Sequence, residues 1–265
     1  MRTRIARAVL LCVVTTVATV FSSAMTVQAA ADGHLNLVFC CAADNDLYRV
    51  MTADETRFPR YSSAEEAIGA APEGAGVLIL ADAYPRKTTT VNAAVFNEAA
   101  KKKLRLYVEY PTLLPAMKVG KPRRAQLERA VVVSDVFGGS LKKMRLLVIH
   151  DCHFVGVQAA NPYLVLAKVA GYDTAVFGLK DTKAYPILFE HPRGGVLVST
   201  TKLSQFVTGR YGPKNAWQGI WKMVLGRLQP GKEIPPLGWT PLVRPTYSRD
   251  AKLPHDAAKK AVIRG

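Results

Sequence analysis

Between residues 35 and 110, short apolar runs alternate with stretches of helical pattern, and this alternation limits the fold more than any other feature of the sequence. The apolar runs lie at 35–40, 77–81 and 104–110. Helical patterns lie at 46–51, 62–71 and 91–103, and Ser62 with Glu65 has the spacing of a capping box. Run 77–81 is apolar throughout, as in a parallel strand that is covered on both faces. The order predicts right-handed crossovers between parallel strands, the arrangement of a doubly wound sheet.

After Pro111 the chain becomes rich in predicted strands. Further apolar runs lie at 130–133, 146–149, 164–167, 174–177, 187–189 and 196–198, and Arg193-Gly194-Gly195 predicts a hairpin turn before the last of them. A long helix follows, with Pro213 in its first turn and a core-facing apolar stripe from 217 to 228. We therefore expect an α/β fold with a doubly wound, mostly parallel, flavodoxin-like sheet and added antiparallel strands in its C-terminal half.

Residues 1–31 have the three parts of a secretion signal. Arg2, Arg4 and Arg7 form a basic start, 9–25 is apolar, and small residues around Ala29 suit cleavage. The apolar part contains several Thr and Ser and falls short of the ~20 apolar residues of a spanning helix, so an uncleaved anchor is the weaker alternative. We expect an exported protein, periplasmic or extracellular, with no membrane association after cleavage. The predicted organisation is a signal peptide at 1–31, an α/β domain at 32–230, and a proline-rich connector with a terminal helix at 231–265.

The formal net charge is +16, and the basic residues lie in short clusters such as 101–103, 121–124 and 142–145. Such clusters can hold nucleic acid or an anionic polysaccharide through charge. No nucleic-acid-binding motif accompanies them, so we expect a solvated basic face and no nucleic-acid partner.

Polar residues follow each predicted parallel strand. The first strand is followed by Asn45, Asp46 and Arg49, the second by Tyr84, and the third ends in Glu109 and Tyr110. Ligands of open α/β sheets bind outside the carboxyl ends of the strands, so these residues form a candidate site for a carbohydrate or another small polar ligand. Asn45 or Asp46 taken alone is typical of a helix N-cap. Catalytic candidates, as acid and base, are Asp46, Glu109 and His150.

The sequence His150-Asp151-Cys152-His153 is a second candidate. On a strand, His150 and Cys152 would face one side and His153 the other, so we expect no metal site there, and we expect no cofactor. No glycine flanks Cys152 to form a strained nucleophile turn. Cys152 could form a disulfide with Cys40 or Cys41 in an oxidising compartment, or all three could be buried thiols, and the sequence leaves both open. His191 precedes the hairpin glycines and is expected to be an exposed turn residue.

These features resemble the class I glutamine amidotransferase-like superfamily, in particular its trehalose-utilisation-like and β-galactosidase middle-domain-like branches. The resemblance covers residues 35–230, and it is carried by segments 35–49, 77–85, 104–111, 186–189, 194–198, 210–211 and 217–228. Active amidotransferases have a Cys on a nucleophile elbow and a later His-Pro-Glu. Here Tyr110-Pro111 follows Glu109, and His191-Pro192 is followed by Arg193. The resemblance implies the fold without its covalent chemistry, that is, a pseudoenzyme. Related modules occur in bacterial exported carbohydrate-active proteins, in some of them ahead of a catalytic helical domain, so the resemblance also implies a glycosidase domain or partner as one option.

Three functions follow from these observations. The leading hypothesis is a non-catalytic accessory or carbohydrate-binding α/β module of an exported bacterial polysaccharide-related protein. The first alternative is a sugar-active hydrolase or isomerase that uses acid and base residues at the strand ends. The second alternative is a structural interaction domain.

Overall fold

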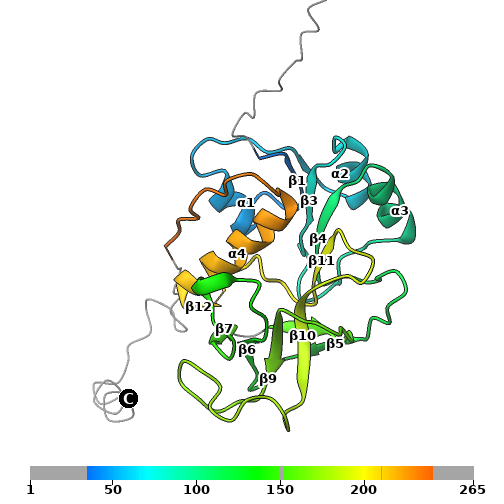
Figure 1. Ribbon diagram of the computed structural model, residues 1–265. Helices are drawn as coiled ribbons and strands as arrows, with labels where there is room; N and C mark the ends of the chain where they lie inside the picture. The colour runs from blue at the N-terminus through cyan, green and yellow to red at the C-terminus, as the bar shows by residue number, and fades with distance from the viewer. Residues whose placement is uncertain (1–34, 150–151, 210, 241–265) are drawn as a thin grey trace, which may run out of the picture. The chain divides into compact units, whose positions relative to one another are not determined.

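The structure is a computed structural model that describes residues 35–149, 152–209 and 211–240. A ten-stranded sheet runs through this part of the chain in the order β12-β7-β6-β9-β10-β11-β4-β3-β1-β2 (Figure 1). Its strands are β1 (Leu37–Cys40), β2 (Arg60–Tyr61), β3 (Gly76–Ile79), β4 (Arg105–Glu109), β6 (Arg129–Val132), β7 (Leu146–Ile149), β9 (Leu164–Ala167), β10 (Ala184–Glu190), β11 (Val196–Ser199) and β12 (Tyr211–Gly212). Strands β5 (Pro122–Arg124) and β8 (His153–Val155) form a separate antiparallel pair.

Strands β1, β3 and β4 lie side by side and run parallel, with β3 in the middle. This arrangement confirms the three parallel strands expected between residues 35 and 110. Strand β2 extends the parallel part beyond β1, and β11 extends it beyond β4. From β11 outward every pairing is antiparallel, through β10, β9, β6, β7 and β12. The chain therefore has an α/β fold with a large mixed sheet, parallel in one half and antiparallel in the other.

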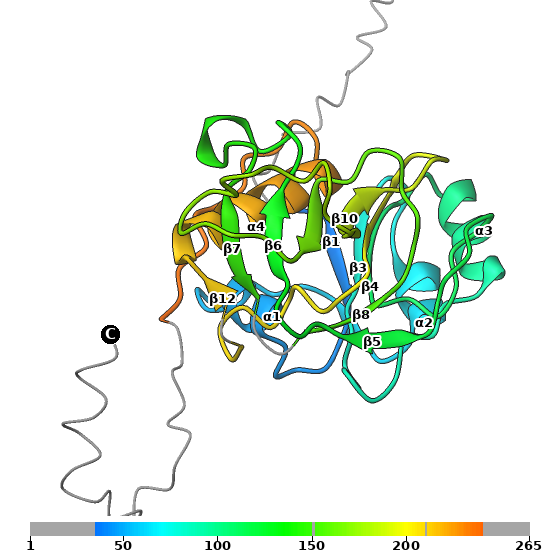
Figure 2. The same cartoon turned by 90° about the horizontal axis from the view of Figure 1, so that it is seen from below.

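Helices lie against both faces of the parallel strands. The α-helices of the described residues are α1 (Asp46–Met51), α2 (Ala64–Ala70), α3 (Ala93–Lys101) and α4 (Lys214–Leu228), and Gly138–Ser140 forms a 3-10 turn. Because neighbouring residues of a strand face opposite sides, Leu37 and Phe39 of β1 are buried with residues of α1 and α4. Val38 and Cys40 are buried with residues of α2 and α3. Figure 2 shows α4 beside the antiparallel strands and α2 with α3 at the opposite side of the sheet.

Helix α4 carries the apolar stripe expected from the sequence. Trp217 and Trp221 have no exposed surface, and the ring of Trp221 meets that of Tyr107 on β4 edge to face at 5.4 Å. Pro213 stands one residue before the helix, as its N-cap, and not in the first turn as expected. A second boundary also shifts, because Ser63 and not Ser62 caps α2 by accepting the N–H of Glu66 at 3.2 Å. Helix caps compete locally for the same backbone donors, so neighbouring serines are hard to separate by spacing alone.

The strand expected at 174–177 is wrong. Thr174 makes one isolated bridge to Arg145, while Val176 and Phe177 are 66% and 86% exposed. Residues 174–177 lie between β9 and β10 in the sequence, and both of these strands already have two neighbours. Strand β9 pairs with β6 and β10, and β10 pairs with β9 and β11. No edge of either strand is open to a further partner, and the run therefore lies in a loop.

Short strands β2, β5, β8 and β12 were not expected, because each spans only two or three residues and lacks an apolar run. Of the two cysteine alternatives, the structure has three buried thiols, and none of Cys40, Cys41 and Cys152 forms a disulfide. No helix in the described ranges is long and apolar enough to cross a membrane. The expected signal at 1–31 and the terminal helix after 254 lie outside the described residues.

Candidate functional site

The carboxyl ends of the parallel strands are covered by the chain itself. The covering residues are 199–208, which begin at the last residue of β11 and which we call the closing segment. Ser199, Thr200, Thr201 and Ser204 of this segment have no exposed surface. Their backbone and hydroxyl groups contact most of the residues expected to form a ligand site.

Glu109, at the end of β4, is fully buried and accepts hydrogen bonds from four groups of the chain. Its Oε1 accepts the backbone N–H of Ser204 at 2.8 Å and the hydroxyl of Tyr107 at 3.0 Å. Its Oε2 accepts the hydroxyl of Ser204 at 2.7 Å and the backbone N–H of Ala81 at 3.2 Å. The carboxylate thus joins the ends of β3 and β4 to the closing segment, and it faces no solvent.

Asn45 and Asp46 also bind within the chain. Asn45 caps α1 by accepting the N–H of Leu47 at 3.0 Å, and its amide donates to the hydroxyl of Ser204 at 3.0 Å. Ser204 therefore links Asn45 to Glu109. Asp46 is 5% exposed, and its Oδ2 accepts the backbone N–H groups of Val207 and Thr208 at 2.8 and 2.7 Å and the Thr208 hydroxyl at 3.1 Å.

The two tyrosines of the expected site lie together. The rings of Tyr84 and Tyr110 meet edge to face with centroids 5.0 Å apart. The hydroxyl of Tyr84 shares a hydrogen bond of 3.2 Å with Thr201 of the closing segment and also contacts the backbone of His153. Tyr110 has no exposed surface and takes a left-handed conformation with φ of +49°, where the chain turns sharply after β4. This sharp turn holds a phenol and no thiol or serine hydroxyl.

The structure brings five of the six expected ligand residues to one edge of the sheet. Asn45, Asp46 and Glu109 are joined through the closing segment, and Tyr84 and Tyr110 lie against each other. Arg49 is exposed in the last turn of α1, away from these contacts. His150, the third catalytic candidate, lies outside the described residues. Cys152 is fully buried.

Burial controls the ionisation of this edge. Burial raises the pKa of Glu109 above its usual range, and the hydrogen bonds from Ser204, Ala81 and Tyr107 oppose this effect. Burial together with the neighbouring Glu109 carboxylate raises the pKa of the Tyr107 hydroxyl. Burial also raises the pKa of Cys40 and Cys41 to about 12, so neither thiol ionises at neutral pH.

His191 differs from expectation, because it is buried and not an exposed turn residue. It is 4% exposed, its Nε2 lies 2.8 Å from the carbonyl oxygen of Pro115, and its Nδ1 accepts the N–H of Arg193 at 3.2 Å. The ring thus fixes the turn before β11 against the loop that follows β4. No group of three or more His, Cys, Asp or Glu side chains in the described ranges is placed to hold a metal ion.

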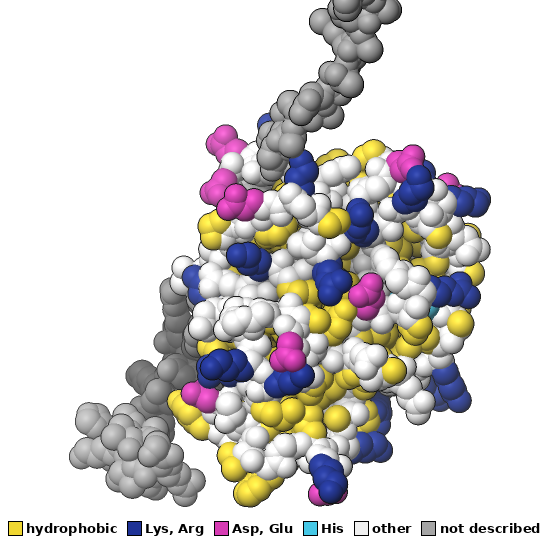
Figure 3. Space-filling view, viewed as in Figure 1, with side chains coloured by type: hydrophobic (Ala, Val, Ile, Leu, Met, Phe, Trp, Pro, Cys, Tyr) yellow, Lys and Arg dark blue, Asp and Glu magenta, His cyan; other side chains and the backbone are white. Residues whose placement is uncertain are grey.

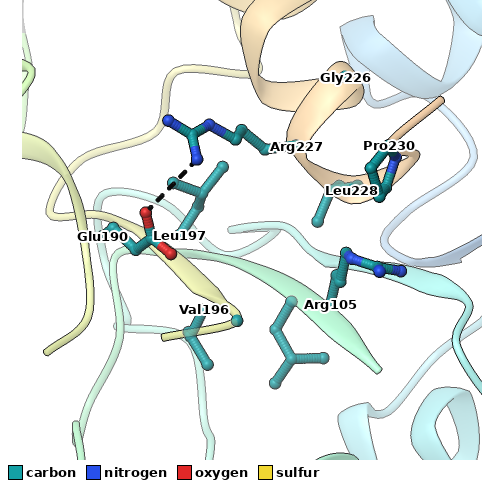
Figure 4. A pocket seen from close by; sticks show the side chains of 10 residues that line it. Arg105, Glu190, Val196, Leu197, Gly226, Arg227, Leu228 and Pro230 are labelled. Atoms are coloured by element: carbon teal, nitrogen blue, oxygen red, sulfur yellow. Dashed lines mark ion pairs between the residues drawn. The ribbon is translucent and has the colours of Figure 1, made fainter. Parts of the chain in front are cut away.

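A small pocket lies at the opposite, amino edge of the parallel strands. It has a volume of about 270 Å³ and lies between the starts of β4 and β11 and the end of α4. Figure 4 shows Arg227 reaching from α4 toward the carboxylate of Glu190, with which it forms an ion pair of 3.9 Å. Glu190 also accepts the hydroxyl of Tyr163 at 3.0 Å, and Arg105 donates to the carbonyl of Gly74 at 3.1 Å. The charged side chains of this pocket, Arg105, Glu190 and Arg227, are thus already bonded to other groups of the chain.

A larger cavity of about 930 Å³ lies beside the β5–β8 pair, and we call it the basic groove. Its walls are the loop before β5, the loop after β8 and the start of β10, and its charged lining residues are Lys118, Arg123 and Lys183. On the face seen in Figure 3, lysine and arginine side chains are scattered among apolar, uncharged and acidic ones. Sequence reasoning missed this groove because its three cations come from three separate segments.

Ser204 and Tyr107 were also missed by sequence reasoning. The segment Ser199-Thr200-Thr201 lies at the end of a buried parallel strand, as the recognised polar residues do, and that position could have indicated that it belongs to this edge of the sheet.

No protein-family model, curated protein or solved structure matches this chain.

Proposed function

We propose that this chain is a non-catalytic, carbohydrate-binding α/β module of an exported, polysaccharide-related protein, with a doubly wound fold of the glutamine amidotransferase-like kind. One observation carries the non-catalytic part of the proposal. Glu109, the acid at the end of β4, has no exposed surface and accepts four hydrogen bonds from the chain. A general acid or base must reach a substrate proton, and a carboxylate with this burial does not.

The remaining groups of this edge support the same proposal. Asp46 holds the backbone of Val207 and Thr208, and the left-handed position after β4 carries Tyr110 in place of a nucleophile. A hydrolase or isomerase acting here would first have to displace the closing segment and break these hydrogen bonds. The parallel strands, with helices against both faces, support the resemblance in fold. Export rests on the pattern of residues 1–31.

A panel of neutral and acidic oligosaccharides tests this function. Binding is followed by calorimetry, and hydrolysis is followed by the release of reducing ends from the same samples. We expect at least one oligosaccharide to bind and none to be cleaved. Glu109→Gln and, as a matched control at the protein surface, Glu98→Gln should likewise release no reducing ends. Cleavage that disappears in Glu109→Gln alone would establish the enzymatic alternative, and a complete lack of binding would remove the carbohydrate proposal.

A further inference from the structure

The basic groove combines volume with positive charge that the described part of the chain does not neutralise. Lys118, Arg123 and Lys183 line it, all three are exposed, and no Asp or Glu is among its lining residues. Within the described residues none of the three forms an ion pair. Several other exposed lysines do pair, as Lys103 does with Glu73 at 2.7 Å and Lys143 with Asp135. The groove therefore keeps a local excess of positive charge.

Aromatic rings hold one of these cations in place. The guanidinium carbon of Arg123 lies 4.4 Å from the ring centroid of Tyr185 and 5.0 Å from that of Phe154, the residue opposite it across the β5–β8 pair. Such stacking orders the guanidinium plane and leaves its N–H edges available to a ligand. A planar cation with ordered N–H groups is suited to carboxylate or sulfate oxygens.

Lys183 lies against the same ring as Arg123. Its ammonium is 5.5 Å from the centroid of Tyr185. Since both cations contact one ring, they are at most ~10 Å apart, which is about one Debye length at 0.1 M salt, so their repulsion is incompletely screened. An anion in the groove relieves this repulsion.

Two glycines set the shape of the groove wall. The N–H of Gly120 donates to the carbonyl of Gly156 at 2.8 Å, which joins the loop before β5 to the loop after β8. A Cβ at position 120 would lie 3.2 Å from that carbonyl oxygen, so a larger residue would push the two loops apart. Gln158, exposed on the second loop, offers a neutral amide to hydroxyl groups.

From these contacts we infer that the basic groove binds an anionic oligosaccharide, with Lys118, Arg123 and Lys183 receiving its carboxylate or sulfate groups. The inference rests on the proposed carbohydrate-binding function and adds the site and the charge class of the sugar. A volume of about 930 Å³ lies within the range of small-ligand sites. The arrangement favours a sugar over single-stranded nucleic acid, because Arg123 and Lys183 already occupy the ring of Tyr185 on which a base would stack.

Calorimetric titrations of the full chain test the inference with four probes: an oligogalacturonate, a sulfated dextran, an unsulfated dextran and a single-stranded oligonucleotide. The groove variant is Lys118→Ala with Arg123→Ala and Lys183→Ala. Its control removes the same charge from exposed lysines outside the groove, as Lys87→Ala with Lys142→Ala and Lys222→Ala. A double variant, Lys118→Ala with Lys183→Ala, retains the stacked arginine in case its loss impairs folding.

We expect an acidic sugar to bind the wild type more tightly than the unsulfated dextran does. The affinity for the acidic sugar should fall as salt is added. The groove variant should lose more than about tenfold in affinity, and the lysine control should lose less than about threefold. The tighter of the two acidic probes identifies the anionic group. Equal losses in groove and control variants, or tighter binding of the oligonucleotide, would overturn the groove assignment while leaving carbohydrate binding intact. If no sugar binds the wild type, the proposed function fails together with this inference.

Discussion

Ser204 donates both its backbone N–H and its hydroxyl to the carboxylate of Glu109, at 2.8 and 2.7 Å, across 95 residues of sequence. The same hydroxyl accepts the side-chain amide of Asn45 at 3.0 Å. One serine thereby ties the closing segment to the ends of β4 and to the start of α1. All three side chains are buried, so the loss of one bond leaves a partner without water to replace it.

Ser204→Ala should therefore destabilise the protein. The change leaves a buried carboxylate oxygen and a buried amide each without one partner, and we expect a loss of about 2–3 kcal/mol in the free energy of unfolding. Ser62→Ala is the matched control, because the Ser62 hydroxyl bonds to Glu66 at the exposed surface, and it should cost less than about 0.5 kcal/mol. Urea unfolding measures both variants. Equal stabilities of the two variants would show that the closing segment does not depend on this serine.

The pH dependence of stability tests the environment of Glu109. Because burial raises its pKa in the folded protein, the folded state holds the proton more tightly than the unfolded state does. The wild type should therefore lose stability relative to Glu109→Gln as the pH rises from about 4.3, the ordinary glutamate value, through the raised pKa. Urea unfolding of both proteins at several pH values gives the difference. A wild type that gains stability over the variant across this range would mean that the four hydrogen bonds outweigh burial and lower the pKa.

Thiol labelling tests the burial of the three cysteines. Cys40, Cys41 and Cys152 are buried, and the raised pKa of Cys40 and Cys41, about 12, leaves almost no thiolate at pH 8. Iodoacetamide should not label these positions in the native protein, and it should label all three after unfolding in urea without a reductant. Peptide mass spectrometry reads each site separately. A position that is labelled only after reduction would be in a disulfide, contrary to the structure.

Gly76, at the start of β3, and Gly69, in α2, provide a matched test of packing. A Cβ on Gly76 would lie 2.8 Å from Cδ2 of Leu37 and 2.9 Å from Cβ of Leu228, so Gly76→Ala should cost about 1–3 kcal/mol of stability. Gly69 lies in α2 with no atom within 4 Å of such a Cβ, and Gly69→Ala should stabilise by about 0.5–1 kcal/mol. Thermal unfolding distinguishes the two. A harmless Gly76→Ala would place the end of α4 farther from the sheet than the structure does.

Long apolar runs allowed much of the fold to be predicted. Runs 77–81 and 104–110 became β3 and β4, and the stripe from 217 to 228 became the buried face of α4, because continuous burial requires continuous or helically spaced apolar residues. The run at 174–177 shows the limit of this reasoning. Its residues have strand propensity, yet both edges of β9 and of β10 are already paired with other strands, so the run has no strand to pair with there. Which strands pair with each other cannot be predicted from the local sequence.

The position of the candidate site could be predicted from the sequence, but its burial from solvent could not. Asn45, Asp46 and Glu109 do lie at one edge of the sheet, because the carboxyl ends of parallel strands meet there. Their hydrogen-bond partners in the closing segment are Ser204, Val207 and Thr208, which are 95 or more residues away in the sequence. The donors that bind a buried carboxylate come from a segment far away in the sequence, and its position depends on the whole fold. The sequence therefore does not show whether a ligand or the chain itself binds these acids.

Asp46 and Glu109 hold the closing segment over the carboxyl ends of the parallel strands. Hydrogen exchange at the backbone amides of Ser204, Val207 and Thr208, which donate to these two carboxylates, tests this arrangement most directly. We expect all three amides to exchange slowly in the protein alone, at rates close to those of β4, and to remain slow when an oligosaccharide is bound. Exchange as fast as in the exposed loop around Phe177, or protection that appears only with sugar bound, would show that this edge is open and that its acids face a ligand.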